Sequence, residues 1–506
     1  MKKIYSLEKL AILTAKIKNK SKSIVLCHGV FDLLHVGHIK HLIKAKEFGD
    51  KLVVTITSDN YVNKGPGKPL FNQRLRTEAI AALEIVDYVA INDSLNAVKP
   101  IRLIKPNVYC KGKDYNNLKD DVTGEIRNEL HELKKIRGKV VFTHELTFSS
   151  SRIINSDTDF YSNKHKKLIK RIKQRYNFES LKKIIEDFNK LKILVIGETI
   201  IDQYSFCEII GKSGKEPMLV LKEINTENYL GGVLAIAKNL FEFSKNITIL
   251  SMIGEKQEFI NEIKNKLPKN IKTKFFLKKN SSTIIKKRYV DSIDKNKILG
   301  VYNINDDVLN KKEEKIFNKY LKNEIKKYDL VIVSDYGHGI ISKSSAIIIC
   351  KYSKFLALNA QINAFNIGYH TMKNYRNFNT LIINEKEIRH EMRDKVGKLE
   401  NLIINLANEK SVNNLIVTKG RSGSILYNKD KKIFFTSEAY ATKIIDKIGA
   451  GDTMLSLMGL CLKSNIDSEL ALLISSLGAA KSVESLANKE SINKINMLKT
   501  LENFFK

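Results

Sequence analysis

A short run near the C-terminus has the residue types needed to transfer a phosphoryl group. Residues 449–452 read Gly-Ala-Gly-Asp, with apolar residues at 444–445 before them and an apolar segment after them. The pattern predicts a strand end, a tight turn and a helix start, whose free backbone N–H groups face a cleft and favour an anion. Asp452 could then take a proton from a hydroxyl while the N–H groups hold the growing charge. An ordinary glycine turn would share this pattern, so the rest of the chain has to decide. The residues assigned to this chemistry are Gly449, Ala450, Gly451 and Asp452.

Two histidines near the N-terminus are spaced to bind a triphosphate. His35 and His38 are three residues apart, with Gly37 between them, at the predicted start of a helix that follows a buried strand. This spacing puts both imidazoles on one side of the first turn, beside its N–H groups. They can donate hydrogen bonds to the charge that builds on an α-phosphate, and the glycine lets the backbone approach closely. Helix-cap histidines or metal ligands are the alternatives, and the strand–turn–helix context favours nucleotidyl transfer.

The elements that must position these groups alternate between strands and helices. Apolar runs at residues 23–28 and 51–57 flank an amphipathic stretch, which is a βαβ pattern and implies a parallel sheet. Farther along, residues 192–197 read as a buried strand, and Asp202 after it is a natural acceptor for substrate hydroxyls. Both halves are therefore predicted as α/β domains with doubly wound, mainly parallel sheets and active sites at the carboxyl ends of the strands.

A strongly basic run separates the two halves. Residues 161–176 place lysines and arginines among apolar residues at partly helical spacing. The run could be a nucleic-acid-binding helix, but a solvated connector between two enzymes is favoured. We expect domains at residues 1–156 and 179–506, joined by a basic linker helix at 157–178.

Length and composition fit a multidomain globular protein. The 506 residues suit two or three domains, and 43% hydrophobic with 28% charged residues is typical of soluble chains. No apolar run approaches the roughly 18–20 residues that span a bilayer, and the first residues lack a secretory signal. We therefore expect a cytoplasmic protein without a membrane partner.

The formal charge of +32 is spread over the whole chain. No arginine-rich arm, zinc finger or aromatic-basic platform stands out. We expect a generally basic surface that attracts phosphorylated substrates and nucleotides, and no nucleic-acid partner.

The five cysteines are scattered and form no C-x-x-C pair. This argues against a disulfide framework and against a zinc site, and predicts small buried apolar residues. They are Cys27, Cys110, Cys207, Cys350 and Cys461.

The N-terminal third resembles the cytidylyltransferase-like superfamily over about residues 22–156. Residues 29–38 are similar to its H-x-G-H signature, and 64–69 to the basic loop near the sugar phosphate. Residues 110–115 resemble the K-G-x-D-Y segment of heptose-phosphate adenylyltransferases, and 147–154 the final phosphate-binding helix start. The resemblance implies attack of a sugar or polyol phosphate on the α-phosphate of a nucleoside triphosphate, with Mg²⁺ and no protein nucleophile. It implies catalytic His35 and His38; nucleotide-binding Gly29, Phe31, Asp32, Gly37, Lys111, Ser149, Ser150 and Ser151; and substrate-binding Lys68 and Arg74.

The second half resembles the ribokinase-like, PfkB-type sugar kinases as an ordered set over about residues 180–500. The two resemblances imply a Rossmann-like nucleotidylyltransferase domain and a ribokinase-like kinase domain with a small β lid, formed near 203–229 and 284–302. Residues 331–339 are similar to the family's strand end, and a stretch containing Thr283, Lys286 and Arg288 is similar to one that reaches substrate or phosphate. The implied positions are Asp202, Gly231, Gly232 and Asn239 for the sugar; Asn384 and Glu387 for metal and phosphate; Lys419, Gly420 and Gly423 for the nucleotide; and Gly449 to Asp452 for the anion hole and base.

Three features depart from the kinase pattern. Glu198 stands where an aspartate is usual, and Ile448 replaces a threonine. Residues 358–364 carry amides where these kinases have an Asp-Pro segment. We expect this segment to retune the sugar specificity or lower the kinase activity.

The fusion resembles bifunctional heptose 7-phosphate kinase/heptose 1-phosphate adenylyltransferases, with the domain order reversed. It implies ATP-dependent phosphorylation of a sugar phosphate and nucleotidyl transfer to a sugar 1-phosphate for surface glycans such as lipopolysaccharide, with ATP and Mg²⁺ as cofactors. One alternative is a CTP-dependent cytidylyltransferase for a glycerol- or polyol-type phosphate, fused to a kinase. Another is a regulatory protein with a decayed kinase half that binds nucleotide or sugar. The chain could form a homodimer.

Overall fold

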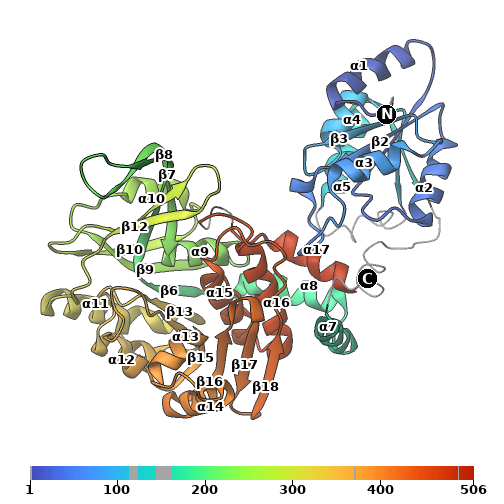
Figure 1. Cartoon of the computed structure of the whole chain (residues 1–506). Coiled ribbons are helices and arrows are strands. Elements are labelled where there is room, and N and C mark those ends of the chain that lie inside the picture. Colours follow the sequence, from blue (N-terminus) through green and yellow to red (C-terminus); the bar gives the residue numbers. More distant parts are fainter. Residues whose placement is uncertain are drawn as a thin grey trace. The chain divides into compact units, whose positions relative to one another are not determined.

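The computed structural model describes residues 3–112, 124–143, 162–369, 372–487, 489 and 491–505. The chain forms two compact units (Figure 1). The first contains Met1–Lys173 together with Ile495–Lys506, and the second contains Gln174–Lys494. None of the described helices is both long enough and apolar enough to cross a membrane.

The first unit is built on a five-stranded parallel sheet in the order β3-β2-β1-β4-β5. The chain order reverses between β1 and β4, and in doubly wound folds ligands bind at such a reversal, beyond the carboxyl ends of the strands. The elements are α1 (Leu7–Lys18), β1 (Ile24–Gly29), α2 (Val36–Lys46), β2 (Lys51–Thr57), η1 (Asp59–Tyr61), α3 (Gln73–Ala81), β3 (Tyr88–Asn92), α4 (Val98–Ile104), β4 (Val108–Gly112), α5 (Glu125–Lys135), β5 (Lys139–Thr143) and α17 (Lys494–Phe505).

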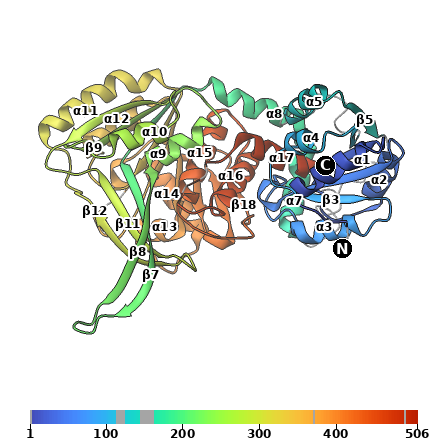
Figure 2. The same cartoon turned by 90° about the horizontal axis from the view of Figure 1, so that it is seen from above.

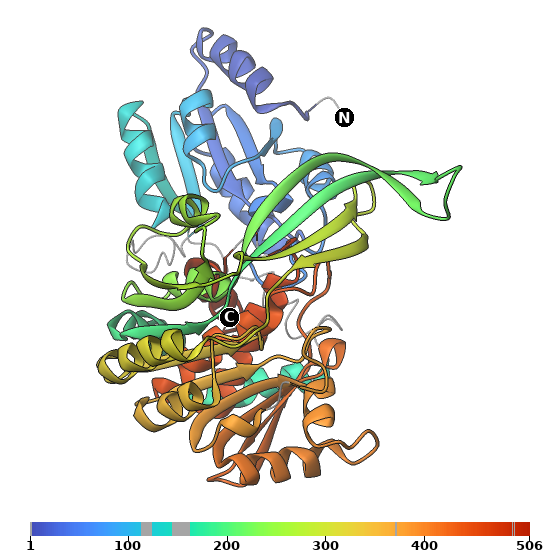
Figure 3. The same cartoon turned by 90° about the vertical axis from the view of Figure 1, so that its left-hand side faces the viewer.

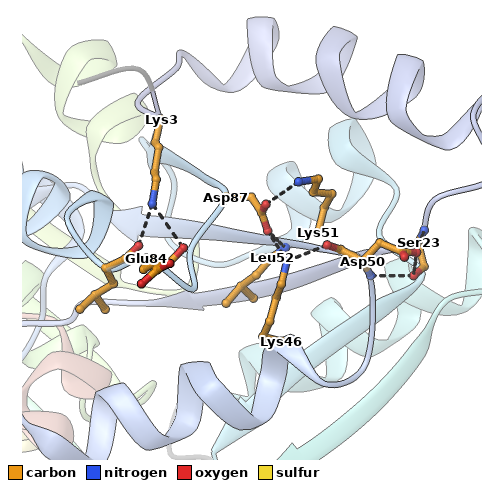
Figure 4. Close-up of polar contacts among 9 residues, drawn as sticks. Lys3, Ser23, Lys46, Asp50, Lys51, Leu52, Glu84 and Asp87 are labelled. Carbon is orange, nitrogen blue, oxygen red and sulfur yellow. Dashed lines mark hydrogen bonds and ion pairs between the residues drawn. The ribbon is translucent and has the colours of Figure 1, made fainter.

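Polar contacts join the amino-terminal ends of the strands of this sheet, opposite their carboxyl ends (Figure 4). Asp87, just before β3, accepts hydrogen bonds from the Lys46 and Lys51 ammonium groups at 2.5 and 2.7 Å, and from the Leu52 backbone at 2.8 Å. Asp50 accepts from the backbone and hydroxyl of Ser23, both at 2.7 Å. These contacts fix where β1, β2 and β3 begin, and leave the carboxyl ends for ligands.

The second unit combines two sheets (Figures 2 and 3). The larger sheet has nine strands in the order β10-β9-β6-β13-β14-β15-β16-β17-β18; they run parallel up to β16 and antiparallel for the last two pairs. The smaller has four strands in the order β12-β11-β7-β8 and includes the long β7–β8 ribbon. Its strands cover the two segments predicted to form the β lid, so the α/β fold class and the lid are confirmed.

The strands of the second unit are β6 (Ile193–Gly197), β7 (Thr199–Lys212), β8 (Leu219–Gly232), β9 (Ile247–Gly254), β10 (Lys272–Lys278), β11 (Ile284–Asp291), β12 (Lys297–Asn303), β13 (Leu330–Asp335), β14 (Leu356–Ala360), β15 (Phe378–Asn384), β16 (Val412–Thr418), β17 (Ser424–Asn428) and β18 (Ile433–Ser437). The helices are α8 (Phe178–Asp187), η3 (Phe188–Lys190), α9 (Val233–Phe241), α10 (Ile260–Lys266), α11 (Lys311–Glu324), η4 (Ile325–Lys327), α12 (Lys343–Tyr352), η5 (Met372–Asn374), α13 (Glu385–Glu391), α14 (Leu399–Lys410), η6 (Gly420–Ser422), α15 (Ala450–Lys463) and α16 (Ser468–Ser482).

The structure divides the chain differently from the sequence at two places. The basic helix α7 (Asn163–Arg175) is not solvated all round, because its apolar side buries Leu168 and Ile172, and the boundary between the units falls within it. Residues 495–506, assigned above to the kinase half, group with the first unit. There the Asn503 side chain donates a hydrogen bond to the Lys64 carbonyl at 3.3 Å, a long-range contact that local sequence pattern does not reveal.

Candidate functional site

The Gly-Ala-Gly-Asp run lies at the N-terminus of α15. Gly449 has φ of 90°, a left-handed conformation that glycine adopts without strain, and it precedes the first helical residue. Asp452 is in the first turn, as predicted. The predicted strand end at residues 444–445 is wrong: this segment is irregular, and Ile445 instead donates its N–H to the Val483 carbonyl at 2.8 Å.

Asp452 is half-buried and contacts a tyrosine that the site assignments omitted. The Tyr336 hydroxyl, just after β13, donates to Asp452 Oδ1 at 3.0 Å. Burial raises the pKa of Asp452 to about 7, and the tyrosine hydrogen bond and nearby Lys286 act in the opposite direction. A carboxyl with a pKa close to the working pH is suited to be a general base.

A pair of cations from the β lid faces the same cavity. Lys286 and Arg288 are two residues apart on β11, so their side chains lie on one face of the strand. Arg288 Nη1 donates to Asp202 Oδ1 at 2.5 Å. Lys286 is buried and makes no ion pair with the described residues. A buried ammonium without an ion-pair partner, beside an arginine, is an anion-binding arrangement.

The glycine pair is required by packing against the predicted sugar-binding aspartate. A Cβ on Gly231 would lie 2.2 Å from Asp202 Oδ2, and one on Gly232 would lie 2.3 Å from the Glu198 carbonyl. Asn239 lies elsewhere: it donates to the Thr453 hydroxyl at 3.2 Å and accepts from Ile492 N–H at 3.3 Å. Its amide nitrogen contacts the start of α15 and its amide oxygen contacts the segment before α17, so it ties these two elements together and is not among the cavity-lining residues.

The cavity has a volume of about 1350 Å³ and continues from the lid to the predicted nucleotide loop. Asn384 and Glu387 form a capping box at the start of α13, and burial raises the pKa of Glu387 to about 7. The structure therefore brings most of the predicted kinase residues to one cavity. The predicted residues that line it are Asp202, Gly232, Asn384, Glu387, Lys419, Gly420, Gly423, Gly449, Ala450, Gly451 and Asp452.

Two of the three features that depart from the kinase pattern have structural roles around Tyr336. Glu198 accepts hydrogen bonds from the backbone N–H groups of Tyr336 and His338 at 3.0 and 2.9 Å. Asn363 and Asn366 both donate to the Tyr336 carbonyl, at 2.8 and 2.9 Å. Asn363 of the amide-rich segment and Asn366 just after it thus hold the backbone of the tyrosine that contacts Asp452.

The two histidines of the first unit stack at the start of α2. Their ring centroids are 3.9 Å apart. His35 caps the helix by accepting the Gly37 N–H at Nδ1, at 3.1 Å, so the proton of the neutral ring is on Nε2. His35 Nε2 and His38 Nδ1 are buried and have no hydrogen-bond partner among the described residues. Burial lowers the pKa of both rings, that of His38 to about 3. Both imidazoles are therefore neutral at physiological pH and can donate hydrogen bonds to a phosphate.

Asp32 holds the basic loop in place. Its carboxylate accepts the N–H groups of Leu70 and Phe71 at 2.8 and 3.1 Å, and it is buried. Lys68 of this loop is also buried, and burial lowers its pKa to about 8. Phe31 packs edge-on against His38. The predicted Asp32 and Phe31 thus position the loop and the histidine.

Other predicted residues of this site have different surroundings. Arg74 is exposed and pairs with Glu78 on its own helix at 2.9 Å. The neighbouring Arg76, not predicted, is buried and donates to the Val30 and Phe71 carbonyls at 2.6 and 2.9 Å. Lys111 is buried near the end of β4 and pairs with Glu129 at 3.0 Å. Gly29 ends β1 and Gly37 is in α2, whereas Ser149, Ser150 and Ser151 lie outside the described residues.

Comparison with protein families agrees with this division. Residues 190–494 match the model of the pfkB family carbohydrate kinases, and residues 26–156 match the cytidylyltransferase-like model.

Several curated relatives carry the name Bifunctional protein HldE. The one from Aliarcobacter butzleri is 42% identical over 138 residues, which is 27% of this chain and 29% of the relative. The one from Nitratiruptor is 37% identical over 138 residues, 27% of this chain and 30% of the relative. The one from Campylobacter jejuni is 28% identical over 291 residues, 55% of this chain and 58% of the relative. The chain thus spans less than a third of the length of the first two relatives, and rather more than half of the third.

Proposed function

The chain belongs to the pfkB family of carbohydrate kinases, and from this premise we propose that it is a bifunctional enzyme of nucleotide-sugar synthesis. The second unit would phosphorylate a sugar phosphate, of the heptose 7-phosphate type, with ATP. The first unit would transfer a nucleotidyl group from ATP to a sugar 1-phosphate and release pyrophosphate. The relatives named Bifunctional protein HldE support two activities in one chain.

The single observation that carries the kinase proposal is the set of groups facing one cavity. Asp452 takes the proton of the sugar hydroxyl as that oxygen attacks the γ-phosphate. The N–H groups of Gly449 to Asp452 at the helix start stabilise the charge on the transferred group. Lys286 and Arg288 bind the phosphate that the sugar already carries, at a distance from the reacting hydroxyl.

The donor set of this cavity fits a magnesium ion carried by a nucleotide. Mg²⁺ takes oxygen ligands and is usually bound through one or two carboxylates plus substrate phosphates. Glu387 with the Asn384 amide would hold it directly or through water. When bound, the ion neutralises triphosphate charge.

In the first unit the nucleophile is already an anion, so a general base is not needed. The sugar phosphate oxygen attacks the α-phosphate, and pyrophosphate is the leaving group. His38 and His35 donate hydrogen bonds to the α-phosphate region, while Lys68 on the Asp32-held loop attracts the phosphate groups.

The test measures ADP and pyrophosphate release by the intact protein. ATP or CTP is offered with a panel of heptose, glycerol and polyol phosphates, with the unphosphorylated sugars as controls. ADP with a heptose phosphate and pyrophosphate from ATP with a heptose 1-phosphate are expected. Pyrophosphate only from CTP with a smaller phosphate would replace the heptose assignment by a glycerol- or polyol-type one. Release of neither product with any pair would contradict an enzymatic role.

A further inference from the structure

Two cysteines and a histidine meet under the nucleotide site of the first unit. Cys27 on β1 and Cys110 on β4 are direct register partners on adjacent parallel strands, so their side chains leave the sheet on the same face. His41 is on α2, which packs on that sheet. One ligand atom from each of the three residues lies within 4.8 Å of the others.

A hydrogen bond at one ring nitrogen of His41 leaves the other ring nitrogen available to bind a metal. Its Nδ1 lies 2.7 Å from the Thr143 hydroxyl, which in turn donates to the Lys111 carbonyl at 3.4 Å. Because the hydroxyl proton points to that carbonyl, the hydroxyl oxygen accepts a hydrogen bond from Nδ1–H, and Nε2 keeps its lone pair. Metal-binding histidines are oriented by just such a hydrogen bond from the other ring nitrogen.

Hydrophobic packing does not account for an imidazole at position 41. Cys27 and Cys110 belong to an apolar cluster that also contains Leu42 and Ala45, the two helix residues that follow His41 on the buried side. A half-buried imidazole directed at two buried thiols is poorly explained by packing, which an apolar side chain would serve better. Two sulfurs and one imidazole nitrogen are the ligand types that Zn²⁺ selects.

We propose that Cys27, Cys110 and His41 bind one zinc ion, with both thiols bound as thiolates and their protons released to solvent. The three protein ligands leave a fourth position for water. The ion would cross-link β1, β4 and α2. Cys27 precedes His28 and Gly29, Cys110 precedes Lys111, and His41 is one turn after His38. A zinc ion here would therefore fix the base of the nucleotide site without contacting the nucleotide.

The experiment uses the full-length, tag-free, reduced protein. It is equilibrated with ZnCl₂, passed through a desalting column and analysed for metal by mass spectrometry; a parallel sample receives Co²⁺ for absorption spectroscopy. We expect one zinc per chain, and a cobalt spectrum with thiolate charge-transfer and intense tetrahedral bands. Cys27→Ser and Cys110→Ser should lose the ion, and His41→Ala should bind it at least tenfold more weakly.

Cys350→Ser is the matched control, because this half-buried cysteine lies in the other unit, on α12. It should keep the full zinc content. Wild-type protein that retains no zinc would overturn the proposal even if the variants fail to fold. Zinc kept by folded Cys27→Ser, or a Cys27–Cys110 disulfide found by mass under native conditions, would overturn it as well.

Discussion

The two proposed phosphate sites lie at helix N-termini and differ in their electrostatics. At α2 the groups proposed to contact the phosphate are imidazoles whose pKa values burial holds below the usual range, so they are neutral hydrogen-bond donors. At α15 the central group is a carboxyl whose pKa burial raises to about 7. A phosphate nucleophile arrives deprotonated, whereas a sugar hydroxyl must lose a proton. The same burial thus supplies a proton acceptor only at the site proposed to need one.

The largest effect should come from separating the two sites. Asp452→Asn removes the proton acceptor and keeps the shape, so we expect ADP release to fall by about 10³-fold while pyrophosphate release persists. His38→Ala should do the reverse, lowering pyrophosphate release by about 10²-fold. Both products are measured on the same protein preparations. If either variant lost both activities while still folded, the two sites would not be independent.

The lid cations should decide which sugars are accepted. Arg288→Ala is expected to raise the KM for a sugar phosphate by about 10²-fold, because a charged partner of the substrate phosphate is lost. The unphosphorylated sugar should change much less. Lys287→Ala is the control, since Lys287 lies between the two cations on β11 and pairs with Glu223 away from the cavity. An equal rise in KM for the phosphorylated and the unphosphorylated sugar would mean that Arg288 only positions Asp202.

The pH profiles should differ between the sites. Kinase activity needs ionised Asp452, so it should be full above its pKa and be lost as the pH falls through about 7. Nucleotidyl transfer should not lose activity through protonation of His38 down to about pH 6, because that ring stays neutral there, and it should decline above about pH 8 as Lys68 loses its charge.

Tyr336→Phe sharpens this test. The tyrosine hydroxyl stabilises the ionised carboxylate, so its loss should lower kinase activity about tenfold at neutral pH and move the acidic limb to higher pH. A lower rate with an unchanged limb would mean that Tyr336 does not act through Asp452. Tyr427→Phe, which removes the hydroxyl of another buried tyrosine, on β17 and outside the cavity, serves as the packing control.

The smallest effect tests the arginine assignment. Arg74 is exposed and paired within its own helix, so Arg74→Ala should change the free energy of unfolding by no more than about 0.5 kcal/mol and the KM for the sugar phosphate by less than about twofold. Arg76→Ala removes the donor for two backbone carbonyls and should cost about 3 kcal/mol. Denaturant unfolding and pyrophosphate assays measure both. A large KM effect of Arg74→Ala at unchanged stability would restore the substrate-binding assignment.

Short-range signals predicted the helix starts that carry the sites. The glycines before an apolar segment predicted the start of α15, and the His-x-Gly-His spacing predicted the start of α2. Such predictions succeed because turn geometry and helix periodicity depend on residues close together in the sequence. The strand assigned to residues 444–445 was wrong, because an apolar pair alone does not distinguish a strand from a segment that packs on a helix end.

What the sequence did not reveal depends on contacts between distant residues. Asn239 sits at a family position, yet its amide is used by Thr453 and Ile492, more than 200 residues away. Tyr336 meets Asp452 across 116 positions. The sequence spacing of the cysteines gave no sign of the cluster proposed as a metal site. Cys27 and Cys110 are far apart in the sequence and become neighbours only through strand pairing.

The C-terminal helix gives the molecule the topology of an insertion. The chain leaves the first unit at residue 173 and re-enters it at 495, so the kinase-like unit is inserted within the transferase-like one. A single nick in the connector near residue 174 would leave the units covalently joined. A fragment ending at 178 would lack Asn503, which holds the Lys64 carbonyl, and Thr500, whose methyl group lies beside Gly65. Recovering the first unit alone would require excising the insert and rejoining residue 173 to 495 with a linker.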